Sequence, residues 1–373
     1  MLTAVTEGAL CLAAHLAARP RGRRPATWPH VTVILPYRER QPIFTAAVRS
    51  LVASGYPRER LRIVLVDDRS PVDHREALAG LGRDFPDVDL VATRVEEAPG
   101  PGQNGKVRAL AWGLGLARRE PADVLVFADA DCEYPPGYIA EMVAAIAATP
   151  GALVSTGYAL AGGAGPVTGF VWQALIGRCL WGGASALRVI PGAFGGAMAV
   201  RVDALDAAGG LRGLETLVAE DIGLACRFAA AGRWPRHVAL PQPVVQRARI
   251  EPMAVRRWVF GALDVYGRAP RFALPAAALV GALLVSPVIL AVWAARSVLI
   301  GGAGMAPIVA LGGVVAVETG IVVWLGRDGP GACLRLLPCF WVARVAILRA
   351  LVAGRHGMRW KGRRVDAVRP GAA

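Results

Sequence analysis

The sequence lacks the residue arrangements that identify zinc proteins, disulfide-rich secreted domains and repeat proteins. Its six cysteines and five histidines are scattered over 373 residues, with no Cys-x-x-Cys pair and no histidine at ligand spacing. Charged residues are few, at 19%, whereas 54% of the residues are hydrophobic and the mean hydropathy is +0.43. This composition argues against a disordered or collagen-like chain, and the scattered cysteines favour a reducing compartment.

Acidic residues are in short supply, and the resulting positive charge is concentrated in two places. The formal net charge is +14, and most of it lies in residues 19–24 and 327–373, which border apolar stretches. Basic residues in such positions are typical of cytoplasmic flanks that face anionic lipid. The charge pattern therefore indicates a membrane as partner and argues against nucleic acid.

Two apolar segments near the C-terminus are long enough to cross a membrane, which takes roughly 20 residues. Residues 272–295 contain no charge, and a second span is predicted at about 306–325, with Glu318 near its end. Basic residues flank the pair, whereas the loop between the two segments has only Arg296. The positive-inside rule then predicts a multi-pass protein of the inner (cytoplasmic) membrane, with its main domain in the cytoplasm. A buried helical hairpin in a large core is the alternative.

Two further apolar segments are predicted to form helices that contact the membrane. Residues 332–353 contain three arginines and a proline, which makes a spanning helix costly and favours an interfacial helix. Residues 2–18 predict either a helix that spans the membrane as a signal anchor or a helix that lies on its surface.

Between these segments, short β-branched runs alternate with helix-like stretches. Residues 31–36, 61–68 and 123–131 are typical of buried parallel strands, and the residues between them predict crossover helices. This order indicates an α/β fold with a mostly parallel, doubly wound sheet. We therefore expect an N-terminal apolar segment with a basic linker (1–28), an α/β domain (29–262) and a membrane region (263–373).

Acidic residues gather at the predicted carboxyl edge of this sheet, where ligands bind in such folds. Asp67 and Asp68 end one strand, and Asp129 and Asp131 end another. Either pair alone is explained by ordinary capping, but two pairs at one edge favour a binding site. Two carboxylates at Asp-x-Asp spacing repel each other unless a cation lies between them. Hard oxygen ligands of this kind select Mg²⁺ or Mn²⁺, and substrate phosphates commonly complete the coordination shell of such ions. A diphosphate leaving group is the expected partner.

Several segments, in this order, resemble the family 2 inverting glycosyltransferases with a GT-A fold. They are VTVILPYRER, LRIVLVDDRSPVD, NGKVRAL, VLVFADADCEYPPGYI, GAMAVRVDALDAAGGL and LVAEDIGLACRFAAAG. The resemblance covers about residues 29–262. It implies a Rossmann-like GT-A domain that transfers a sugar from a nucleotide diphospho-sugar, with a UDP-sugar as the expected donor.

The membrane segments and the ending MRWKGRR narrow the resemblance to the ceramide glucosyltransferase-like group and its bacterial relatives, including those associated with hopanoid biosynthesis. Acceptors in that group are lipids. The group usually carries Gln or Arg three residues before an Arg-Trp pair, whereas this chain has Ala254 before Arg257 and Trp258, with Arg256 or Gln246 as candidate substitutes.

The resemblance also implies roles for single residues. Asp131 is expected to ligate the metal, Asp129 to support both ribose and metal, and Asp221 to be the catalytic base. Glu220, Arg257 and Trp258 are expected near the acceptor or the diphosphate. The donor nucleotide is expected to contact seven residues of the first loop, the strand ends and the NGK segment, namely Pro36, Arg38, Glu39, Asp67, Asp68, Ser70 and Lys106.

The chemistry of an inverting transfer supports the assignment of Asp221. A carboxylate must take the proton of the acceptor hydroxyl while a metal stabilises the departing diphosphate. Glu220 and Asp221 begin a helical stretch, and a helix N-terminus stabilises anions; simple helix capping is the alternative. Gly195 and Gly196 precede it, and we expect these small residues to let a sugar approach the backbone.

Three alternatives remain at this stage. Residues 170–190 predict a membrane-facing flap that helps to admit a lipid, with buried core as the other interpretation. A processive polysaccharide synthase is a second enzymatic hypothesis, although two or three spans are few for a translocation channel. A nucleotide-sugar sensor or scaffold without turnover is the non-enzymatic one.

Overall fold

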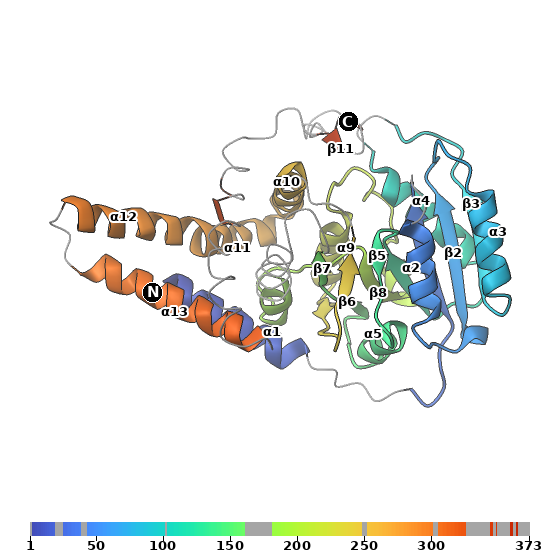
Figure 1. Ribbon diagram of the computed structural model, residues 1–373, viewed down its shortest axis with the longest axis horizontal. Coiled ribbons are helices and arrows are strands. Elements are labelled where there is room, and N and C mark those ends of the chain that lie inside the picture. The colour runs from blue at the N-terminus through green and yellow to red at the C-terminus, as the bar shows by residue number, and fades with distance from the viewer. Residues whose placement is uncertain are drawn as a thin grey trace.

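The structure is a computed structural model, and a seven-stranded sheet lies at its centre. It describes residues 2–18, 25–38, 43–100, 103–160, 181–247, 252–300 and 305–325, together with 344, 345, 348, 359, 360, 363 and 364. An α/β domain occupies one end, and a pair of long helices projects from the other (Figure 1).

The strand order in the main sheet is β3-β2-β1-β4-β8-β6-β9. The first four strands in this order run parallel, β8 is antiparallel to both of its neighbours, and β9 is parallel to β6. The strands are β1 (Val31–Tyr37), β2 (Leu61–Asp67), β3 (Asp89–Arg94), β4 (Val124–Ala128), β6 (Leu153–Ser155), β8 (Ala197–Arg201) and β9 (Arg236–His237). The sequence-based prediction of a mostly parallel α/β sheet is thus confirmed.

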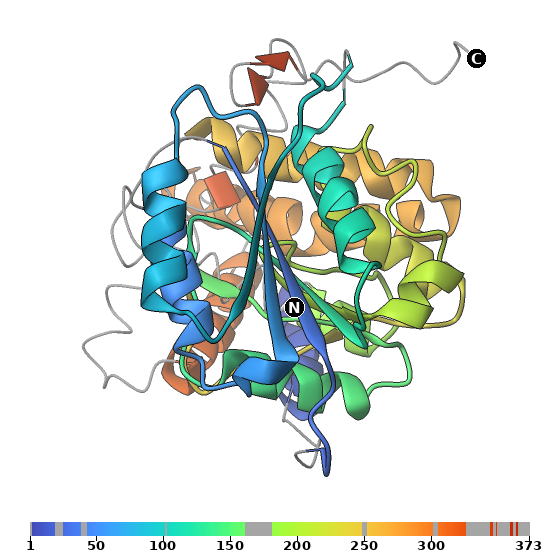
Figure 2. The ribbon, with the colours of Figure 1, turned by 90° about the vertical axis from the view of Figure 1, so that its right-hand side faces the viewer.

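Helices cover both faces of the sheet, which explains why its central strands are apolar throughout. All seven residues of β1 are buried, and alternate residues contribute to two separate cores, with Ile34 in one and Val33 in the other. Figure 2 shows the blue helices on one side and the teal and yellow-green helices on the other. The helices of the domain are α2 (Ile43–Val52), η1 (Arg58–Arg60), α3 (Arg75–Asp84), α4 (Gly105–Ala117), α5 (Tyr138–Ala147), α7 (Ala184–Ala186), α8 (Val202–Ala207) and α9 (Glu220–Ala230).

Close packing of α4 on the sheet depends on Gly113. A Cβ atom at this position would collide with the side chain of Ile34 on β1. The glycine therefore lets α4 lie directly on β1 and β2, and this fixes the height of the α4 N-terminus above the carboxyl edge of the sheet.

A small second sheet lies beside that edge. It has the order β5-β10-β7, from β5 (Cys132–Glu133), β10 (Val244–Gln246) and β7 (Tyr158–Leu160). Because β10 is antiparallel to β5, with Gln246 opposite Cys132, residues far apart in sequence lie next to the Asp129–Asp131 segment.

The C-terminal part is helical. Residues 272–295, the predicted first span, lie in the continuous helical stretch of α11 (Pro270–Val280), the π-helical η3 (Gly281–Val285) and α12 (Ser286–Ile300). Residues 270–299 are long and apolar enough to cross a membrane, and Leu274, Ile289 and Val298 are exposed on its surface. The apolar α13 (Ala306–Leu325) packs against α12, and α10 (Pro252–Arg268) precedes them.

The N-terminal apolar segment is the helix α1 (Leu2–Ala18), which lies alongside α13 (Figure 1). Its Glu7 and Glu318 of α13 both form buried ion pairs with Arg344. Most of residues 332–353 lie outside the described part of the chain, so the interfacial helix stays a prediction. A short hairpin of β11 (Arg359–Trp360) and β12 (Arg363–Arg364) follows.

The cysteines depart in one respect from the sequence-based interpretation. Cys11 of α1 is disulfide-bonded, whereas Cys132 and Cys226 are free. Regular spacing reveals disulfide frameworks only in small cysteine-dense domains, so the spacing of the cysteines did not predict this bond.

Candidate active site

Lys106 lies at the centre of the predicted site, in the first turn of α4. Its Nζ is 2.7 Å from Oδ1 of Asp129 and 3.1 Å from Oε1 of Glu220. Burial lowers the pKa of the ammonium, but the two carboxylates outweigh this effect and raise the pKa well above its ordinary value. Lys106 is therefore a permanent cation between the end of β4 and the start of α9.

Asn104 holds this arrangement, and it is not among the site residues predicted from motifs. It is the N-cap of α4, where its Oδ1 accepts a hydrogen bond from the Lys106 amide at 3.0 Å. Its Nδ2 donates to the Leu217 carbonyl at 3.0 Å and to Oε2 of Glu220 at 3.2 Å. The capping preference of asparagine before a predicted helix was the available signal, whereas the contact with Glu220 exists only in the folded chain.

Asp221 lies half-buried beside this cluster. Its Oδ2 accepts from the Gly195 amide and its Oδ1 from the Ile222 amide, both at 2.8 Å. Burial, followed by the neighbouring Glu220 carboxylate, raises the pKa of Asp221 to about 7, against the opposing effects of Lys106 and the two amides. A carboxylate with a pKa near neutrality is suited to accept a proton.

The glycine pair before β8 makes room for carboxylates. A Cβ atom at Gly196 would collide with the Asp129 carboxylate, and one at Gly195 would press on Asp221 at 3.2 Å. The sequence predicts that these glycines admit a sugar; in the structure, Asp129 and Asp221 occupy the space beside them.

Asp131 is held from the second sheet. Its backbone carbonyl accepts from the Arg247 amide at 2.8 Å, and its Oδ2 accepts from Nε2 of Gln246 at 3.4 Å. Arg247 also forms an ion pair with Glu133. The pairing of β10 with β5 thus orients the segment that carries the second acid of the Asp-x-Asp pair.

The donor set fits a hard divalent cation. Asp129 and Asp131 offer carboxylate oxygens, and Oε1 of the buried Gln246 has no hydrogen-bond partner in the part of the chain that the structure describes. Within those same ranges no group of three or more His, Cys, Asp or Glu residues gathers around a possible ion position. Two carboxylates that leave positions open for phosphate oxygens suit Mg²⁺ or Mn²⁺.

The ends of β1 and β2 form the other side of the site. Oδ1 of Asp67 accepts from the Ser70 amide at 2.6 Å, and Arg94 lies 3.5 Å from its Oδ2, so Asp67 closes a turn. The Asp68 amide donates to the Tyr37 carbonyl at 2.8 Å. Across the described ranges the Asp68 carboxylate makes no ion pair or hydrogen bond, and it remains available to a ligand.

The remaining predicted residues are placed only in part. Pro36 is buried within β1, opposite Val66, and Arg38 directly follows the strand. Trp258 is half-buried in α10 against the core, whereas Glu39, the Arg257 side chain and residues 170–180 lie outside what the structure describes. The proposed roles of Arg257 and Trp258 therefore stay predictions.

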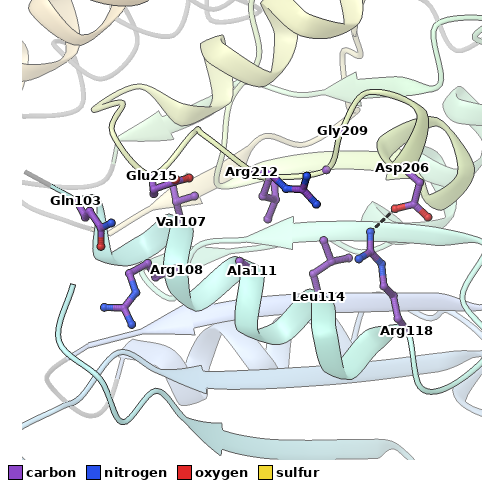
Figure 3. Close-up of a pocket in the computed structure, with 12 residues that line it drawn as sticks. Gln103, Val107, Arg108, Ala111, Leu114, Arg118, Asp206, Gly209, Arg212 and Glu215 are labelled. Atoms are coloured by element: carbon purple, nitrogen blue, oxygen red, sulfur yellow. Dashed lines mark hydrogen bonds and ion pairs between the residues drawn. The ribbon is translucent and has the colours of Figure 1, made fainter. Parts of the chain in front are cut away.

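A groove of about 730 Å³ runs along the outer side of α4 (Figure 3). It lies between α4 and the segment from α8 to Glu215, with Arg118 and Asp206 paired at one end. None of the predicted site residues lines it. The carboxylate cluster is therefore separate from this groove.

The fold and the carboxylate edge together define the protein as a glycosyltransferase of the GT-A class. The chain belongs to glycosyl transferase family 21, whose family model matches residues 1–365. This confirms the resemblance to the ceramide glucosyltransferase-like group. No curated protein sequence matches the chain.

Similarity to solved structures extends over most of the chain. The mannosyltransferase PcManGT from Pyrobaculum calidifontis, in complex with GDP-Man and Mn²⁺, shares the fold with a TM-score of 0.58 and 21% identity, over 93% of this chain and 96% of that one. Two weaker similarities are to GalNAc-T7 and to S. aureus TarS. GalNAc-T7 with UDP, GalNAc and Mn²⁺ has a TM-score of 0.46 at 19% identity, over 66% of this chain and 51% of that one. TarS 1-349 with UDP-GlcNAc has a TM-score of 0.44 at 14% identity, over 86% and 88%.

The raised pKa of Asp221 predicts how activity depends on pH. Below about pH 7 the carboxyl takes up a proton and loses its capacity as a base, so we expect the transfer rate to fall as pH decreases and to level off above pH 7. Initial rates between pH 5 and 9 measure this, with Asp206→Asn on the surface as control. A wild-type rate that stays constant down to pH 5 contradicts the assignment.

Two substitutions of Asn104 separate its capping role from its contact with Glu220. Asn104→Ala removes both and should lower the unfolding free energy by about 1 kcal/mol. Asn104→Ser keeps a capping oxygen but is too short to reach Glu220, so the thermal midpoint should stay near that of the wild type. We expect reduced transfer rates in both variants. Full activity of Asn104→Ser would show that the contact with Glu220 is dispensable.

Proposed function

We propose that this glycosyltransferase is a membrane-bound, metal-dependent enzyme that moves a sugar from a nucleotide diphospho-sugar to a hydroxyl group of a lipid, with inversion at the sugar carbon. The observation that carries the proposal is Asp221, half-buried and held by two backbone amides beside the Lys106–Asp129–Glu220 cluster. The cluster supplies the cationic and anionic groups that a nucleotide diphosphate and a divalent metal require.

Donor binding is assigned to the sheet edge. The Asp68 carboxylate, which has no partner in the described ranges, would bind the nucleoside. The Lys106 ammonium would bind the diphosphate. Asp129 and Asp131 would hold Mg²⁺ or Mn²⁺, which neutralises charge on the departing diphosphate when bound. The complex of PcManGT with GDP-Man and Mn²⁺ is consistent with this division.

Proton transfer is assigned to Asp221. The carboxylate accepts the proton of the acceptor hydroxyl while the acceptor oxygen forms a bond to the anomeric carbon from the face opposite the leaving group. The bond from that carbon to the diphosphate oxygen breaks, and its electron pair leaves with the nucleoside diphosphate. The Gly195 and Ile222 amides keep the carboxylate in place, so its orientation is set before the substrates bind.

The apolar helical region next to the α/β domain supports a lipid as the acceptor. The α/β domain is continuous with a helical stretch, residues 270–299, that is apolar enough to cross a bilayer and exposes large apolar side chains. A membrane on this side would bring an embedded hydroxyl within reach of the domain. The basic residues around 272–325 favour a cytoplasmic site, with the helical stretch of residues 270–299 and α13 as a spanning hairpin.

The test is to incubate the full-length protein with UDP- and GDP-sugars, Mn²⁺ and extracted membrane lipids, and to look for a new glycolipid by mass spectrometry. We expect one product with the wild type and a loss of roughly 10²-fold or more with Asp221→Asn, the usual scale for loss of a general base. The matched control is Asp206→Asn. Binding of a nucleotide sugar without transfer to any lipid would instead favour a sensor.

Two further substitutions separate metal from donor binding. Asp131→Asn removes an anionic ligand at constant shape, so we expect weaker Mn²⁺ affinity in the presence of the nucleoside diphosphate and lower turnover. Asp68→Asn should weaken donor binding and leave the Mn²⁺ dependence unchanged. Titration calorimetry with UDP and GDP measures both quantities. An Asp131→Asn variant with wild-type Mn²⁺ affinity contradicts the assignment.

A further inference from the structure

The helix α1 connects the two halves of the molecule. It packs against α13 and η3 of the apolar helical region, and also against α7 and β9 of the α/β domain. Figure 1 shows it running from the helical pair to the edge of the domain. Neither the transfer chemistry nor the donor site uses this helix.

The first attachment of α1 is a buried charge cluster. Arg344 pairs with Glu7 of α1 and Glu318 of α13, and the three side chains are exposed by 0%, 1% and 0% respectively. The Arg344 Nε also donates to the Leu283 carbonyl in η3 at 3.0 Å. Buried charges are costly unless they are paired, so this cluster joins α1, α13 and η3 at one defined register.

The second attachment is at the other end of α1. Nε and Nη2 of Arg236, on β9, donate to the Ala17 carbonyl at 2.9 and 2.7 Å. A cation at the C-terminus of a helix satisfies free carbonyls and complements the helix dipole. In the middle of α1, between the two attachments, a side chain at Gly183 would collide with the backbone of Leu10, so α1 lies directly on the domain.

The two sides of α1 differ in character. Glu7, Leu10, Cys11 and Ala14 form the buried stripe at helical spacing, whereas the side of Leu12 and Leu16 remains exposed by 59% and 52%. An apolar outer side on a helix whose inner side carries the charge cluster is suited to a lipid environment.

The attachment at β9 lies close to the catalytic carboxylate. His237, next to Arg236, packs its ring against Phe194 with 5.9 Å between ring centroids. Phe194 precedes Gly195, whose amide holds Asp221 at 2.8 Å. The position of α1 on β9 is therefore linked by direct contacts to the position of the base.

We propose that α1 is a strut that sets the position of Asp221 relative to the membrane, with Arg344, Glu7 and Arg236 as positioning residues. One end is fixed within the apolar helices and the other on the sheet edge, so the distance from bilayer to base is defined by a single rigid helix. The proposal rests on the proposed lipid acceptor, because only an acceptor held in a bilayer requires this distance to be fixed.

The test compares two reactions of the full-length protein in lipid nanodiscs. Arg236→Ala detaches the end of α1, and we expect the KM for the bilayer lipid to rise and kcat/KM for lipid transfer to fall by about tenfold or more, since small displacements of reactants are costly. Hydrolysis of the nucleotide sugar without acceptor should remain unchanged. The control is Arg233→Ala, which removes a neighbouring arginine in the segment between α9 and β9.

A second pair of variants avoids charge changes. Gly183→Ala should push α1 off the domain through its collision with Leu10, and it should reproduce the selective loss of lipid transfer. Gly115→Ala, where an added Cβ meets nothing within 4 Å, is the matched control. In both Arg236→Ala and Gly183→Ala, we expect faster amide hydrogen exchange in α1.

The charge cluster is tested separately. Arg344→Met leaves two carboxylates buried without their cation, so the yield of folded protein should drop. Adding Glu7→Gln and Glu318→Gln should restore it, because removing all charges avoids the desolvation penalty. Folding of Arg344→Met at wild-type yield would show that the cluster does not hold α1.

The outcomes distinguish the strut from the proposed function. If the wild type hydrolyses the donor but glycosylates no lipid, the proposed acceptor is wrong and the strut proposal falls with it. If the wild type glycosylates a lipid and Arg236→Ala and Gly183→Ala do so equally well, only the strut is wrong. An equal loss of lipid transfer and donor hydrolysis in these variants also overturns it, because the defect then lies in the site itself.

Discussion

The ion pairs of Lys106 are the interaction on which the site depends. One ammonium links Asp129 at the end of β4 to Glu220 at the start of α9, so it brings together two segments about ninety residues apart in sequence. Without this cation, Asp129, Glu220 and Asp221 would place three carboxylates in a partly buried space, where water screens their mutual repulsion less than at the surface. The same cation limits how far the pKa of Asp221 rises, so the carboxylate can still ionise near neutral pH.

Supporting contacts around this cation come from three separate elements. Asn104 fixes the N-terminus of α4, the glycine pair before β8 leaves room for Asp129 and Asp221, and β10 holds Asp131 through Gln246. Each contact contributes only a small stabilising free energy, yet each orients a group before any substrate binds. Preorganised polar groups of this kind are the main means by which a protein stabilises developing charge.

In the apolar helical region, too, charges are stabilised by partners from distant segments. Three arginines in residues 332–353 made a spanning helix costly in the sequence-based prediction, yet Arg344 is fully buried, because Glu7 and Glu318 supply two carboxylates. Each of these three charges belongs to a different apolar segment. Their compensation becomes visible only when α1 and α13 lie side by side, since the partners are separated by more than three hundred residues in one case.

Local sequence determined the secondary structure and the kind of chemistry. Apolar β-branched runs predicted β1, β2 and β4, and the acids at their ends identified the ligand edge, because strand period and strand polarity are local properties. Lys106, Asp129, Glu220 and Asp221 were all named from motifs, and the structure places them together. Tertiary structure alone decided the contacts of Asn104 with Glu220 and of Gln246 with Asp131. It also decided that Asp129 fills the space beside Gly196 and that Arg344 is paired. Each depends on two segments meeting at one register, and no local pattern in a single sequence specifies that register.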